Sequence, residues 1–141
     1  MTFAESWYNA NFQMFMLAYP GVWIEIESDA YEWVLIHNFP LPSNFQQQST
    51  RLLMLLPGLT QPVATPPRHY YVNQDLTLTS GRRPKHIFDN AVFHGARELS
   101  NLGYAYACVL LTRWRPSADV VSGDNLVSVT NLIYERLEQA V

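Results

Sequence analysis

The sequence predicts an α+β fold, with one helix at each end of the chain and an antiparallel sheet between them. Segments with helical periodicity occur near the two ends, and the runs between them are apolar and joined by short turns. Because no helical pattern separates these runs, a wound parallel sheet is not expected. A length of 141 residues fits one globular domain, and we expect residues 1–141 to form it.

The first predicted element is a helix from Phe3 to Leu17. Its aromatic residues Trp7, Phe12 and Phe15 recur at spacings that place them on one helical face. The sequence Tyr19-Pro20-Gly21 follows, and proline cannot continue a helix. We therefore expect a short helix with one apolar face to lead the domain and to end at this point.

Four strands are predicted next, as an antiparallel meander. The runs are short, apolar and rich in β-branched or aromatic residues, and turn or proline signals separate them. A turn at 28–30 joins the first two into a hairpin, and Pro57-Gly58 ends the third. The four strands are Val22–Glu27, Trp33–Phe39, Thr50–Leu56 and His69–Val72.

The second half of the chain predicts an irregular region followed by a helix. From Asn73 to Gly103 the pattern loosens, and residues 87–99 fit an irregular helical turn. The apolar run 104–111 should be buried or should cover buried groups. The three-and-four spacing of apolar residues over 126–137 predicts a C-terminal amphipathic helix, capped by Ser122 or Asp124.

Composition excludes several functional classes. Nine Lys plus Arg stand against twelve Asp plus Glu, a formal net charge of -3, so the chain lacks the basic field that nucleic-acid binding needs. Prolines and charged residues, Pro20, Glu25, Pro57 and Arg113, leave no apolar run long enough for a membrane span. With one cysteine and no signal-peptide pattern, we expect a cytoplasmic protein. No glycine-rich phosphate loop or metal-ligand motif occurs, so no cofactor and no metal is predicted.

A family resemblance rests on several short motifs spread over nearly the whole chain. Pro66-Pro67 follows the third predicted strand, and Cys108 precedes Trp114-Arg115-Pro116. This order resembles the ubiquitin-conjugating (UBC) fold, in which a Pro-Pro pair follows the third strand and a catalytic cysteine precedes a Trp-x-Pro element. A second set of motifs is Trp33 to Pro42, Leu52 to Pro57, and Trp114-Arg115-Pro116 followed by Gly123 to Leu126. Together these are similar to the bacterial branch described as prokaryotic ubiquitin-conjugating family E.

Two departures from the UBC pattern leave two roles open for Cys108. The His-Pro-Asn tripeptide that precedes the cysteine in eukaryotic members is absent, and about forty residues separate Pro67 from Cys108. If the stretch 111–114 corresponds to the aromatic-rich element of family E, Cys108 is a packing residue. Otherwise it is a nucleophile, because a thiolate can carry an acyl group.

Acyl transfer at Cys108 also needs a donor for the oxyanion that forms. Asn101 lies seven positions upstream, a spacing that resembles that of the asparagine in the missing tripeptide, so Asn101 is the candidate donor with Asn73 in reserve. Arg113 and Arg115 are cations close in sequence that would favour the thiolate.

The resemblance implies that the chain carries a bacterial ubiquitin-like protein as a Cys108 thioester. The implied partners are a ThiF-type activating enzyme and a deconjugating metalloprotease, with neither nucleic acid nor a membrane. One alternative is a non-catalytic UBC-fold adaptor that binds the ubiquitin-like protein or its activating enzyme. Another is an aromatic-lined domain for a small ligand, unrelated to conjugation.

Overall fold

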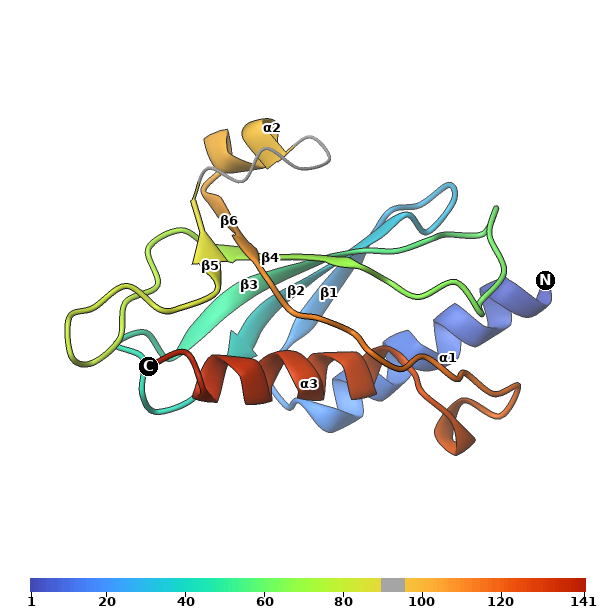
Figure 1. The fold of residues 1–141 in the computed structure, drawn as a ribbon. Coiled ribbons are helices and arrows are strands. Elements are labelled where there is room, and N and C mark those ends of the chain that lie inside the picture. The colour runs from blue at the N-terminus through green and yellow to red at the C-terminus, as the bar shows by residue number, and fades with distance from the viewer. Residues whose placement is uncertain (90–95) are drawn as a thin grey trace.

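The computed structural model describes residues 1–89 and 96–141, and its fold is α+β, as the sequence predicts (Figure 1). One helix precedes an open antiparallel sheet and another follows it. In chain order the elements are α1 (Phe3–Ala18), β1 (Trp23–Ile26), β2 (Trp33–Pro40), β3 (Ser49–Leu55), β4 (His69–Asn73), β5 (Ile87–Phe88), α2 (Ala96–Asn101), β6 (Tyr104–Ala107), the 3₁₀ turn η1 (Val120–Ser122) and α3 (Leu126–Glu138).

The sheet has six strands in the order β1-β2-β3-β4-β6-β5, and every neighbouring pair is antiparallel. The predicted meander of four strands is present as β1 to β4. The predicted strand count was wrong, because β6 pairs with the free side of β4, Tyr70 opposite Ala107, and β5 pairs with β6. The sheet therefore continues beyond the meander with strands that return from the second half of the chain.

Both additional strands lacked a readable pattern. In β6, tyrosine alternates with alanine, and since both residue types are apolar the alternation is not one of polarity. Tyr104, Ala105 and Ala107 are buried, and Tyr106 is half-buried. Strand β5 has two residues and falls where a helical turn was expected. Residues 90–95 of that expected turn lie outside the described part, and α2 covers its last part.

Both long helices begin at side-chain caps. The Thr2 side chain accepts a hydrogen bond from the Glu5 N–H at the start of α1. At α3 the cap is Asn125, in a reciprocal capping box with Ser128, and not Ser122 or Asp124 as predicted. Asp124 is used differently: its carboxylate accepts the backbone N–H of Arg115 at 2.8 Å.

The main core lies between the inner face of the sheet and the helices α1 and α3. Its fully buried members include Phe15 from α1, Ile36 and Met54 from the sheet and Ile133 from α3. Asn11 is also fully buried, and its Oδ1 accepts the N–H of Leu126 at 2.7 Å. This bond satisfies a donor at the start of α3 and joins the two helices.

The outer face of the sheet carries a smaller apolar cluster. Leu53, Tyr71 and Tyr104 are buried there, and Leu99 of α2 packs against them. Figure 1 places α2 on the opposite side of the sheet from α1 and α3. Beyond these residues the outer face is only partly covered, as the half-buried side chains of Trp33 and Tyr106 show.

Candidate functional site

Cys108 follows directly after the last residue of β6, and its side chain is exposed. The backbone N–H of Cys108 donates to the carbonyl of His86 at 2.8 Å, so the sheet fixes its position. Its neighbours Ala107 and Val109 are both buried. Because side chains alternate along an extended chain, this burial turns the Cys108 thiol toward the outer face, on the same side as Tyr106.

A hollow of about 240 Å³ lies beside Cys108. One wall comes from the chain just before β4, and the other comes from the end of β6 and the residues after it. The lining residues are Pro66, Pro67, Arg68, His69, Tyr106, Cys108, Val109, Leu110 and Leu111. The hollow exists because the segment before β4 and the segment after β6 separate here. The strand pairing between β4 and β6 ends at Tyr70 and Ala107.

The charged and polar groups around the hollow differ from those expected. Arg68 is exposed and lines it, a cation that sequence reasoning missed although it directly follows Pro66-Pro67. Arg113 and Arg115 were the expected cations, but neither lines this hollow, and the Arg113 guanidinium lies 3.6 Å from the Asp124 carboxylate. Burial raises the pKa of the Tyr106 hydroxyl, and the nearby Cys108 charge raises it further.

The structure does not bring either predicted oxyanion donor to Cys108. Asn101 is the last residue of α2 and precedes β6, whereas Cys108 follows β6. An extended strand of this length separates them by on the order of 13 Å. Asn73 lies opposite Tyr104 at the same distant end, where its Oδ1 accepts the Nε–H of Arg51 at 2.6 Å. Seven positions of sequence separate Asn101 from Cys108, and four of the residues between them form the extended strand β6.

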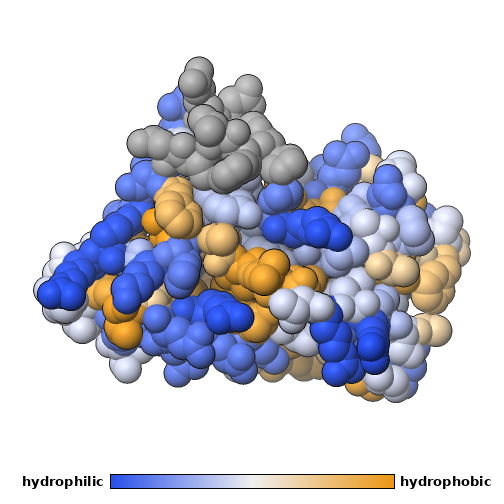
Figure 2. All heavy atoms as spheres, viewed as in Figure 1, coloured by the Kyte–Doolittle hydropathy of each residue, from blue (hydrophilic) through white to orange (hydrophobic). Residues whose placement is uncertain are grey.

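Residues 109–114 continue from Cys108 without regular secondary structure. The far end of this segment is anchored, because the indole Nε1–H of Trp114 donates to the carbonyl of Val63 at 2.9 Å and its ring meets that of Trp7 edge to face. In Figure 1 the segment passes across the sheet toward the start of α3. Figure 2 shows apolar side chains gathered at the middle of the side of the molecule that Figure 1 views. Within the segment 109–114, Leu110 is 70% exposed.

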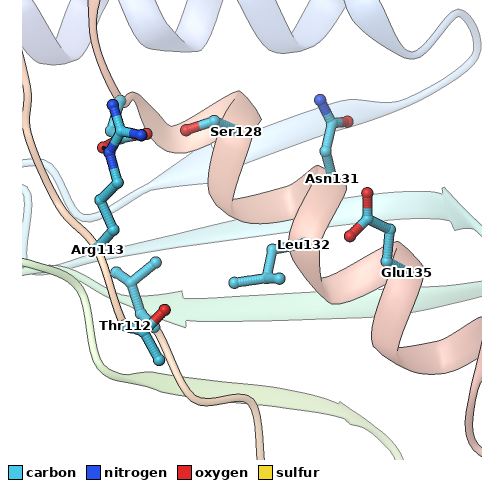
Figure 3. A pocket seen from close by; sticks show the side chains of 8 residues that line it. Thr112, Arg113, Ser128, Asn131, Leu132 and Glu135 are labelled. Carbon is cyan, nitrogen blue, oxygen red and sulfur yellow. Dashed lines mark ion pairs between the residues drawn. The ribbon is translucent and has the colours of Figure 1, made fainter.

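A second hollow, of about 330 Å³, lies on the other side of the same segment. Figure 3 shows Arg113 reaching from the segment toward α3, whose Ser128, Asn131 and Glu135 form the opposite wall with Leu132. Leu111 lines both hollows. The segment after Cys108 is therefore a ridge with a depression on each side.

The described residues, 1–89 and 96–141, contain no group of three His, Cys, Asp or Glu side chains placed to hold a metal ion. His37 lies on β2, next to the edge strand β1 on the far side of the sheet; its ring stacks on Trp23 and its Nε2 lies 3.0 Å from Glu25 Oε2. Among the described helices, none is both long enough and apolar enough to cross a membrane.

In comparisons with known proteins, no family model, no curated protein and no solved structure matches the chain. The resemblance to UBC-like proteins therefore rests on the sequence motifs alone, and a function has to be argued from Cys108 and its surroundings.

Proposed function

We propose that this chain carries a ubiquitin-like protein as a thioester on Cys108, between an activating enzyme and an amine target, in the manner of a UBC-like protein. The observation that carries the proposal is the exposed Cys108 side chain, fixed at the end of a strand and beside an open hollow. A free cysteine is more often a buried apolar residue, so exposure at a fixed position favours a chemical role.

Two of the motifs that carry the family resemblance line this hollow, and a third lies on the segment that leaves it. Pro66 and Pro67 form part of its wall together with Cys108, although about forty residues separate them in the sequence. The segment after Cys108 is anchored at Trp114, whose indole N–H donates to the carbonyl of Val63. Val63 lies just upstream of the two prolines. This convergence supports a common role for the motifs at one site.

The proposed transfer is an exchange of acyl groups between sulfur atoms. The Cys108 thiolate attacks the carbonyl carbon of the modifier's C-terminal thioester on the activating enzyme, and the tetrahedral intermediate expels that enzyme's thiolate. An amine then attacks the new thioester, loses a proton and releases the Cys108 thiolate. Neither step requires a metal or a cofactor on this chain.

A backbone N–H group takes the place of Asn101 as the candidate oxyanion donor. The N–H groups of Val109 and Leu110, the next two after Cys108, make no hydrogen bond within the described part of the chain. Because successive N–H groups of an extended chain point to opposite sides, one of these two is the candidate. Donors that are fixed and unused can stabilise a developing negative charge without reorganisation. Arg68, exposed on the same hollow, adds a positive charge.

The test is a charging reaction with purified components. The chain, the ubiquitin-like protein and the ThiF-type activating enzyme are incubated with ATP, and adducts are resolved with and without a reducing thiol. We expect an adduct that the thiol removes, and Cys108→Ser should abolish it. A thiol-sensitive adduct on Cys108→Ser, or none on the unchanged chain, would refute the proposal.

A matched control moves the only thiol by two residues. In the double variant Cys108→Ser with Leu110→Cys, the sulfur lies at another strongly exposed position of the same segment. If Cys108 is positioned for transfer, the thiol at 110 should charge at least ten-fold more slowly. Equal rates would mean that any exposed thiol suffices.

The distance between Cys108 and both asparagines favours a second candidate, a non-catalytic UBC-fold adaptor. An adaptor would bind the ubiquitin-like protein or its activating enzyme equally well with serine at 108. We expect Cys108→Ser to retain binding in either case, so the deciding measurement is the alkylation rate of Cys108 against pH. A thiolate already reactive at neutral pH indicates transfer, and reactivity that rises only above about pH 8.5 indicates an adaptor.

A further inference from the structure

The backbone of residues 109–114 is unused for hydrogen bonding. Within the described ranges 1–89 and 96–141, none of its N–H groups donates and none of its carbonyls accepts a hydrogen bond. The groups on either side are paired: the Cys108 N–H donates to His86 and the Arg115 N–H donates to Asp124. Six consecutive residues therefore present free donors and acceptors.

The first part of the segment has the burial pattern of a strand. Exposed Cys108, Leu110 and Thr112 alternate with buried Val109 and half-buried Leu111, the pattern of an extended chain on a core. The alternation ends at Thr112, because Arg113 is exposed as well. No residue of the segment has a positive φ. Since both ends are held, little conformational entropy remains to be lost when another chain pairs with it.

The neighbouring chain cannot provide this pairing. Extending the register of β4 and β6, in which Tyr70 lies opposite Ala107, would place Val109 opposite Arg68 and Leu111 opposite Pro66. Pro66 and Pro67 have no backbone N–H to donate. The segment before β4 and the segment after β6 separate at this point, and the hollow of about 240 Å³ lies between these two segments.

We propose that residues 109–114 receive the C-terminal tail of the ubiquitin-like protein as an added antiparallel β-strand. The inference rests on the proposed function, which fixes the occupant as an extended chain whose last carbonyl must reach Cys108. Because Cys108 stands at the N-terminal end of the segment, the tail runs opposite to it. Arg68 is exposed on the hollow at the Cys108 end, where the carbonyl oxygen of the tail gains negative charge when it is attacked.

Strand addition predicts a two-residue period along the bound tail. In an antiparallel pair, the N–H groups of alternate residues point to the partner strand, and those between point away. Removing an inward N–H costs one hydrogen bond, which corresponds to about a five-fold loss of affinity. Removing an outward N–H costs nearly nothing.

The experiment tethers a synthetic peptide to Cys108 by a disulfide, so that no activating enzyme is needed. The probe is acetyl-Thr-Val-Thr-Val-Gly joined to cysteamine, and acetyl-Gly-cysteamine is the short reference. The equilibrium between each probe and the protein is measured by intact mass spectrometry in a thiol-disulfide buffer. A set of probes, each N-methylated at one residue, follows the pairing position by position.

We expect the long probe to form the mixed disulfide at least ten-fold more favourably than the short one. N-methylation should lower this preference about five-fold at alternate residues and less than two-fold at those between. A long probe with no advantage, or equal losses at every position, would overturn strand addition.

A matched control places the thiol elsewhere. Leu102 is 65% exposed beyond the other end of β6, so Cys108→Ser with Leu102→Cys offers a surface thiol away from residues 109–114. The long and short probes should react equally there. A flat scan at Cys108 together with normal charging by the activating enzyme would leave the thioester proposal standing and remove the strand. An alternating scan at Cys108 without charging by the activating enzyme would support the added strand and refute the thioester proposal.

Discussion

Adjacent residues of one strand can have opposite energetic roles. Tyr70 and Tyr71 in β4 are both buried, one in the main core and one in the outer cluster. The Tyr70 hydroxyl donates to the carbonyl of Pro67 at 2.9 Å, whereas the Tyr71 hydroxyl is buried with no hydrogen-bond partner among the described residues. A buried polar group without a partner loses its hydration and gains nothing in exchange.

Replacing each tyrosine by phenylalanine should therefore change stability in opposite directions. Tyr70→Phe removes a hydrogen bond and leaves the Pro67 carbonyl unpaired, so it should lower the free energy of unfolding by about 1 to 2 kcal/mol. Tyr71→Phe removes an unpaired hydroxyl and should be neutral or raise it by about 1 kcal/mol. Urea unfolding of the two variants measures the difference. Equal destabilisation would contradict the assignment of the two hydroxyls.

At this scale the sequence identified the candidate nucleophile but not its surroundings. Cys108 was found because it is the only cysteine, yet its apolar neighbours gave no sign that it is exposed. Asn101 was chosen by its spacing, which cannot reveal that a strand lies between the two residues. The role of Arg68 depends on chain separation at Pro66-Pro67, which is a property of tertiary structure.

At the scale of elements, the helices and the first four strands were readable because each has its own local signal. Caps, periodicity and proline positions are short-range features, and they gave α1, α3 and the meander. Strand β6 depends on pairing with β4, about thirty residues away, and its tyrosine-alanine pattern carries no polarity signal. The cap of α3 was misplaced because Asp124 holds Arg115 instead.

The turn between Arg115 and α3 depends on a close backbone approach at Gly123. A Cβ atom there would lie 2.6 Å from the Arg115 carbonyl oxygen and 2.7 Å from the Ser117 nitrogen. These are backbone atoms, so a side chain could be accommodated only by moving the chain that ends the segment after Cys108.

We expect Gly123→Ala to destabilise the protein by about 3 kcal/mol through overpacking. Gly81→Ala is the matched control: Gly81 has φ +84°, but a Cβ added there would meet no atom within 4 Å, so only backbone strain of about 1 kcal/mol remains. Thermal melting compares the two variants. A smaller loss at Gly123 than at Gly81 would contradict the close approach.

At the scale of the whole molecule, buried tyrosines couple stability to alkaline pH. Burial raises the pKa of six tyrosine hydroxyls: Tyr8, Tyr19, Tyr70, Tyr71, Tyr104 and Tyr106. In the unfolded chain these groups ionise near pH 10. Above that pH the unfolded state loses protons that the folded state retains, so unfolding becomes more favourable.

The free energy of unfolding should therefore be insensitive to these groups below pH 10 and fall as pH rises beyond it. Each tyrosine that stays protonated in the fold contributes a slope of up to about 1.4 kcal/mol per pH unit. Urea unfolding between pH 9 and 11 measures this slope. Tyr70→Phe should make the slope shallower by the contribution of that one tyrosine. A slope unchanged by Tyr70→Phe would contradict retention of its proton.

The late position of β6 in the chain has a consequence for truncated chains. Strands β1 to β4 are complete at Asn73, but the partner of β4 begins at Tyr104. A chain that ends between these points leaves the edge Tyr70 to Val72 unpaired, and exposed edges of this kind recruit other strands. We therefore expect such a fragment to aggregate where the full chain does not.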